Sequence, residues 1–139
     1  MNKEQFIEAL NQDLATEYQS IVQYVQHTAT ITGPEYQSIV DELKTHLSQE
    51  LEHAMTLAEQ IDFLGGTPTV DVPKVPNEPD SKAALQLDLK LESDQLERYR
   101  QRVADAVDLG LPDVAEALRP VLQQTQDHVR ELQTALEEP

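Results

Sequence analysis

Five side chains that can bind divalent metal ions interrupt otherwise apolar stripes of the sequence: Glu17, Glu50, His53, Glu92 and His128. A carboxylate buried by itself costs several kcal/mol or takes up a proton, and three placed together also repel one another. A pair of divalent cations removes both penalties, and mixed carboxylate and imidazole ligands suit Fe(II), Mn(II) or Zn(II). The pattern therefore predicts a dinuclear metal site, provided that the chain brings the five together. The alternative is that they are ordinary helix residues whose buried face has been misassigned.

Four segments with helical periodicity have to position these side chains. They span roughly residues 3–31, 35–64, 82–109 and 112–137. Residues 32–34 and 110–112 each place a glycine where one helix ends and a proline where the next begins, whereas residues 65–80 contain four prolines and cannot be helical. We expect Asn2 with Gln5 to cap the first helix and Ser81 to cap the third. Pro120 should kink the fourth helix.

The rise of an α-helix places the five residues at matching heights. Glu17 lies about 15 residues before the first turn and Glu50 about 16 after it, which corresponds to about 25 Å. Glu92 and His128 lie about 17 residues on either side of the second turn. Each pair of helices therefore brings its metal-binding groups to one level.

The lengths of the connections predict an all-α fold, a four-helix bundle with one long crossover between helices two and three. The first and last connections are tight, so they join antiparallel neighbours. The middle connection has about 16 residues, and a proline-rich extended chain of that length spans about 50 Å, enough to run the length of the bundle. Both levels of polar residues can then meet at mid-bundle. We treat residues 1–139 as a single domain of this kind.

With these motifs in this order, the sequence resembles the ferritin-like di-iron carboxylate proteins, most closely bacterioferritin. The resemblance covers nearly the whole chain and rests on five stretches that carry the family pattern: Glu17 to His27, the Glu50-x-x-His53 motif, the helix exit at 63–68, Asp88 to Glu92, and the surroundings of His128. A lone Glu-x-x-His motif is weak, but the ordered set is specific.

The resemblance implies a role for each of the five residues. Glu17 and His53 would be the terminal ligands of one iron ion. Glu92 and His128 would serve the other ion, and Glu50 would bridge the two.

The resemblance also extends to residues around the ligands. Tyr24 would donate a hydrogen bond to one of the carboxylates, although a core tyrosine satisfied elsewhere is an equal alternative. Thr125 stands where the family has a second bridging glutamate, and its hydroxyl could instead hydrogen-bond to an anion that bridges the metals. Leu51 stands where bacterioferritin has its haem-binding methionine, so no haem is expected. The short fifth helix of the family is missing, which implies a homodimer or other small homo-oligomer rather than a 24-subunit cage.

Three further polar residues have more ordinary interpretations. His46, one turn from Glu50, is interpreted as a surface or hydrogen-bonded histidine, with a part in iron transit as the alternative. His27 would be a favourable charge at the end of the first helix. Glu97 should face solvent.

Composition excludes several classes of function. The net charge of −16 argues against a nucleic-acid binder, since the phosphate backbone requires Lys and Arg. The lack of cysteine excludes disulfides, zinc–thiolate sites and iron–sulfur ligation. No apolar run approaches the length of a transmembrane helix and no signal region is apparent, so we expect no membrane association and a cytoplasmic location.

The leading hypothesis is an iron-binding, ferroxidase-type protein of iron homeostasis. It would bind two iron ions (Mn or Zn being possible substitutes) and oxidise Fe(II) with O₂ or peroxide. The alternatives are a non-enzymatic metal-binding bundle, because one bridging carboxylate is missing, and a metal-free helical interaction module.

Overall fold

Four long helices make up the structure, a computed structural model that describes residues 1–137. They are α1 (Lys3–Thr30), α2 (Gln37–Phe63), α3 (Ser81–Asp108) and α4 (Pro112–Leu136), and a single 3₁₀ turn, η1 (Pro34–Tyr36), precedes α2. No strand is present among the described residues. The predicted all-α bundle is therefore confirmed, with helix ends within two residues of the expected ones.

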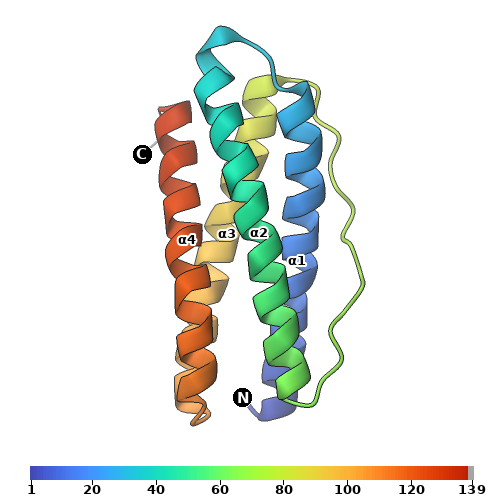
Figure 1. Cartoon of the computed structure of the whole chain (residues 1–139), viewed down its shortest axis with the longest axis vertical. Helices are drawn as coiled ribbons and strands as arrows, with labels where there is room; N and C mark the ends of the chain where they lie inside the picture. Colours follow the sequence, from blue (N-terminus) through green and yellow to red (C-terminus); the bar gives the residue numbers. More distant parts are fainter. Residues whose placement is uncertain (138–139) are drawn as a thin grey trace.

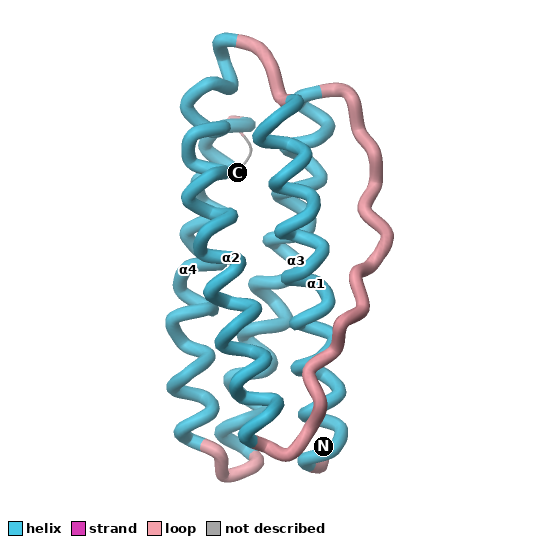
Figure 2. The backbone as a smooth tube through the Cα atoms, turned by 45° about the vertical axis from the view of Figure 1, so that its right-hand side comes forward, coloured by secondary structure: helices cyan, strands magenta, loops and turns pink. Residues whose placement is uncertain are grey.

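The helices form two antiparallel hairpins that pack side by side (Figures 1 and 2). α1 packs on α2 and α3, while α4 packs on α3 and α2. The segment between α2 and α3 runs the full length of the bundle along the outside of α1, so that α2 and α3 point the same way (Figure 1). The Asn11 side chain holds this segment by donating to the Thr67 carbonyl (3.1 Å) and accepting from the Thr69 amide (2.8 Å). The predicted single crossover is confirmed.

Local sequence signals set most helix ends. The side chains of Asn2 and Gln5 form the expected reciprocal cap at the start of α1. Gly33 and Gly110 adopt positive φ angles of 112° and 73°, which suits a residue without a Cβ at the turns that end α1 and α3.

The predicted cap of the third helix was wrong by one residue. Asp80, not Ser81, is the N-cap of α3, and its carboxylate accepts from the Ala83 amide at 2.9 Å. An aspartate is as good a cap as a serine and adds a negative charge at the positive end of the helix. Ser81 begins the helix, and its hydroxyl accepts from the Thr32 amide at 3.0 Å, which ties α3 to the end of α1.

Pro120 does not interrupt α4, which is helical from Pro112 to Leu136. The buried face of the helix accordingly continues past the proline. Thr125 is buried in the bundle, while the neighbouring Gln124 is partly exposed.

Two apolar clusters fill the bundle, one toward each end. One includes Phe6, Leu10 and Leu57, and the other includes Leu43 and Leu132. The five residues singled out by the sequence lie between them, in a polar layer across all four helices. The apolar clusters exclude water from both sides of this layer, which raises the cost of any unneutralised charge in it.

Candidate metal centre

Two groups of metal-binding side chains meet in the polar layer and share one residue. In each group the candidate ligand atoms all lie within 4.8 Å of one another; the groups are Glu17, Glu50 and His53, and Glu50, Glu92 and His128. All five side chains are buried. The structure thus brings together every residue that the sequence suggested as a ligand, with Glu50 in the middle.

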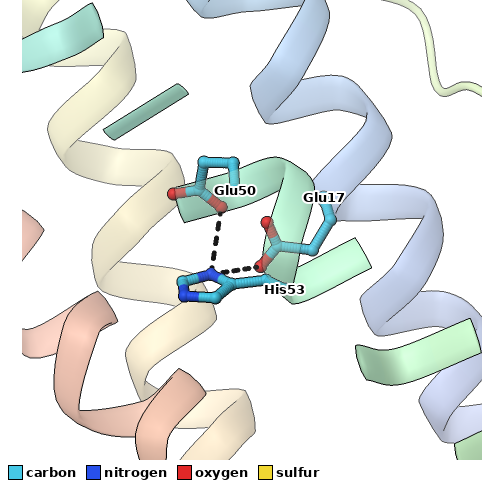
Figure 3. Close-up of side chains that lie close together, drawn as sticks. All are labelled: Glu17, Glu50 and His53. Atoms are coloured by element: carbon cyan, nitrogen blue, oxygen red, sulfur yellow. Dashed lines mark ion pairs between the residues drawn. The ribbon is translucent and has the colours of Figure 1, made fainter. Parts of the chain in front are cut away.

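The first group joins α1 to α2 (Figure 3). The Nδ1 atom of His53 lies 3.6 Å from a Glu17 oxygen and 3.5 Å from a Glu50 oxygen. Glu50 and His53 are three residues apart on α2, so one helical turn points both at the same space.

The second group joins α2 to the other hairpin. The Nδ1 atom of His128 in α4 lies 2.9 Å from Glu50 Oε1 and 3.4 Å from Oε1 of Glu92 in α3. Each half of the centre therefore presents one imidazole and one carboxylate of its own, together with an oxygen of Glu50. Such a donor set suits a first-row divalent metal ion.

Amide side chains orient both imidazoles. His53 Nε2 lies 2.7 Å from Gln124 Oε1, and His128 Nε2 lies 2.6 Å from Gln49 Oε1. Because an amide oxygen only accepts, each Nε2 carries the proton and donates it. In the neutral form of each imidazole, the lone pair is therefore on Nδ1, the atom that faces the carboxylates. Partners of this kind orient metal-binding histidines in proteins.

Tyrosine and glutamine side chains orient the outer carboxylates. The Tyr24 hydroxyl donates to Glu92 Oε1 at 2.6 Å, as the sequence suggested. The Tyr99 hydroxyl donates to Glu17 Oε1, and Gln95 Nε2 donates to the same oxygen at 3.0 Å. One oxygen of each carboxylate is thereby held by the protein.

Two buried atoms in the first group lack a hydrogen-bond partner. They are Glu17 Oε2 and His53 Nδ1. A buried polar atom left without a partner costs about 1–3 kcal/mol. A cation between these atoms would satisfy both, so the residues present fit a metal ion.

The titration of the metal-free site reflects the same crowding of negative charge. Burial, followed by the charges of Glu17 and Glu92, raises the pKa of Glu50 well above its ordinary value. Burial also acts to raise the pKa of Glu92, but hydrogen bonds with Glu50, His128 and Tyr24 outweigh it and lower that pKa. The pKa of His53 is raised, because its contacts with Glu17 outweigh the opposing effect of burial. In the absence of metal, protons on Glu50 and His53 therefore reduce the negative charge of the site, which bound cations could neutralise instead.

Thr125 lies inside the bundle, as expected, but its hydroxyl has a different partner. It donates to the backbone carbonyl of Val121, one turn earlier, at 2.8 Å. The proton that we expected to reach a bridging anion is therefore engaged with the helix backbone. Only the lone pairs of the hydroxyl remain for another contact.

The predictions for the two histidines outside the centre have to be corrected in part. His27 is fully buried, and its Nδ1 pairs with Asp88 of α3 at 2.8 Å, so it joins two helices rather than only neutralising a helix end. His46 is also buried, so it is not a surface histidine, but its Nε2 is hydrogen-bonded with Glu131, as the other part of that interpretation expected. Glu97 is exposed, as expected, and pairs with Arg100 at 2.6 Å.

The sequence pattern did not single out three residues that contact the ligands: Gln49, Gln95 and Tyr99. A signal existed for two of them. Gln95 and Tyr99 lie three and seven residues after Glu92, a spacing that puts them on the same face of α3.

The exposed position of Leu51 is consistent with its place one residue beyond the buried Glu50. Its exposed fraction is 54%, on the outer face of α2.

None of the described helices combines the length and the apolar character needed to cross a membrane.

Comparison with known proteins agrees with this geometry. The family model for the ferritin-like domain matches residues 7–139. A solved structure from Bacillus anthracis str. Ames, described as ferritin like, diiron-carboxylate proteins, is 32% identical and superposes with a TM-score of 0.90 over 96% of both chains. The bacterioferritin-related protein of Bacteroides fragilis, a dodecameric thioferritin, shares the fold with a TM-score of 0.87 at 22% identity, over 99% of this chain and 87% of that one. The chain belongs to the ferritin-like family.

Proposed function

We propose that this protein binds two iron ions in the polar layer and oxidises Fe(II) with O₂ or peroxide, as part of iron homeostasis. The observation that carries the proposal is the pair of buried carboxylate and histidine groups that share Glu50. The similar protein of Bacillus anthracis is described as a diiron-carboxylate protein, which supports iron over manganese or zinc.

In this proposal Glu17 and His53 would hold one ion and Glu92 and His128 the other, and Glu50 would contact both. Bound iron supplies the electrons that reduce the oxidant. The protein holds the ligands in place through Tyr24 and Tyr99 and keeps bulk water out with the apolar clusters on either side. Glu50 gives up its proton when the cations enter, because only the carboxylate can contact both.

A second candidate, metal binding without turnover, is favoured by the contact made by Thr125. Three carboxylates leave two divalent ions with one uncompensated positive charge, which is costly in a site of low dielectric. The Thr125 hydroxyl adds no negative charge and donates its proton to Val121. Under this alternative, only one site fills tightly and oxidation is slow.

Two measurements separate these functions. Metal analysis of the purified protein should find bound iron, and a metal-free protein that also fails to take up added Fe(II) would favour the interaction module. Stopped-flow absorbance after Fe(II) is added in air should then show oxidation faster than in buffer. Glu50→Ala should lose this acceleration, and Glu97→Ala, at an exposed position, should retain it. Stable binding of Fe(II) without acceleration would contradict the oxidase and favour the second candidate.

We also propose that the chain assembles as a homodimer or other small homo-oligomer. Exposed apolar side chains on α1 and α2 supply a surface for pairing: Val22, Val25, Leu51 and Met55. The Bacteroides fragilis protein is described as dodecameric, so a dodecamer is the competing arrangement.

A further inference from the structure

A second set of metal-binding side chains lies outside the centre described above, between α2 and α4. Glu42 and His46 are four residues apart on α2 and therefore share a face, and Glu131 faces them from α4. The candidate ligand atoms of the three residues lie within 4.8 Å of one another. Glu42 and Glu131 also line a solvent-open hollow of about 280 Å³, together with Asp127, Arg130 and Thr134.

His46 is the buried member of this group. Only 2% of its side chain is exposed; Nε2 faces a Glu131 oxygen, and Nδ1 has no hydrogen-bond partner. Its ring is stacked on that of His128, with centroids 4.0 Å apart and planes at 22°, and Tyr24 packs against it edge-on. These contacts hold the imidazole with Nε2 directed toward the Glu131 carboxylate.

Burial, followed by the nearby His128, lowers the pKa of His46. Burial and the charge of Glu131 raise the pKa of Glu42, which reflects two carboxyl groups crowded together. Within the described residues 1–137, no lysine or arginine forms an ion pair with either of them, although Arg130 lines the same hollow.

We propose that Glu42, His46 and Glu131 bind a single divalent cation next to this hollow, as a mononuclear site that exchanges with solvent. One imidazole and two carboxylates suit first-row divalent ions and leave coordination positions free for water. The buried His46 distinguishes this group from an ordinary acidic patch, because an imidazole held in a fixed direction adds affinity that diffuse negative charge lacks.

The site is independent of the dinuclear centre in its ligands. None of Glu42, His46 and Glu131 belongs to either group around Glu50, although the ring of His46 stacks on that of His128. Loss of one site therefore need not remove the other. A cation can occupy the hollow even if the proposed oxidase activity is absent.

Crystals grown with Zn(II) provide a direct test, since an anomalous map at the zinc edge locates each ion separately. The wild-type protein should show a peak about 2.0–2.2 Å from His46 Nε2 and from oxygens of Glu42 and Glu131. The peak should be lost in the double variant Glu42→Gln/Glu131→Gln, while zinc at the dinuclear centre remains. Both glutamines keep the shape of the side chains, and both positions reach the surface, so the fold should be preserved.

The matched control is Asp127→Asn, which removes one negative charge from the same hollow without touching the three ligands. It should keep the peak, and calorimetric titration should find one more Zn(II) per chain in the control than in the double variant. If the double variant does not fold, Glu131→Gln alone should weaken this binding at least about tenfold. The proposal is overturned if wild-type crystals show no peak, if the peak survives in the double variant, or if Asp127→Asn removes it as well.

Discussion

At the scale of single residues, Glu50 occupies the central position because both metal-binding groups include it. Its two oxygens face opposite ways, Oε2 toward His53 and Oε1 toward His128. Glu17 and Glu92 each belong to only one group. Replacing these residues therefore has different consequences for the two halves of the centre.

We expect Glu50→Ala to abolish binding of a metal pair, whereas Glu92→Ala should leave one site. The reason is that Glu50 is the only carboxylate within reach of both imidazoles among the described residues. Calorimetric titration with Co(II) measures the stoichiometry, with Glu97→Ala as an exposed control. Two metals bound to Glu50→Ala with unchanged affinity would refute the bridging role.

The raised pKa values of two ligand residues predict that metal binding releases protons. The pKa values of Glu50 and His53 are both raised, so below these values the metal-free site holds protons. A metal ion must displace them, so affinity should rise with pH until both groups have lost their protons in the free protein, and then level off. Titration in buffers of different ionisation enthalpy counts the released protons. A metal affinity that stays constant from pH 5 to about pH 7 would contradict this expectation.

At the scale of elements, α4 decides whether the centre has room for a fourth carboxylate. Pro120 leaves the helix continuous, and Thr125 lies one turn before His128 on its buried face. A glutamate at position 125 would therefore begin on the buried face of α4, the face that also carries His128.

We therefore expect Thr125→Glu to tighten the second metal site and to speed iron oxidation, because it supplies the missing negative charge. Gln126→Glu adds the same charge on the exposed face of α4 and should change neither property. Metal stoichiometry and unfolding by urea should be measured together. Reduced stability with unchanged metal binding would show that the new carboxylate is buried without a partner.

The start of α3 offers a test of the corrected helix cap. Asp80→Ala should lower the free energy of unfolding by about 1 kcal/mol, because the Ala83 amide loses its acceptor. Ser81→Ala should cost less, since it removes only an exposed contact with the Thr32 amide. Chemical denaturation measures both variants. A larger loss for Ser81→Ala would restore the original assignment of the cap.

At the scale of the whole molecule, the bundle places a charged layer between two apolar clusters. The crossover makes this possible, because it lets α2 and α3 run in parallel and brings the second hairpin to the level of the first (Figure 2). Hydrogen bonds from Asn11 and Tyr18 to the crossover hold it against α1.

Assembly is the prediction that belongs to this scale. Multi-angle light scattering should report about twice the chain mass of 15.7 kDa, because the exposed apolar side chains of α1 and α2 can be covered by one partner. Val25→Lys should weaken the dimer, and Val107→Lys, an exposed valine on α3, serves as the control. A mass near twelve chains would instead indicate a dodecamer, as described for the Bacteroides fragilis protein.

The sequence by itself determined the four helices, the crossover and the group of five candidate ligands. Helical rise and periodicity are local properties, so counting from the turns at Gly33 and Gly110 was enough to align Glu17 with Glu50 and Glu92 with His128. Only the tertiary structure decided which side chains orient these ligands and which pair elsewhere. Tyr99 donating to Glu17 and His27 pairing with Asp88 both cross from α1 to α3. Such contacts depend on how two helix faces rotate and interlock when they pack, which no spacing along a single helix specifies.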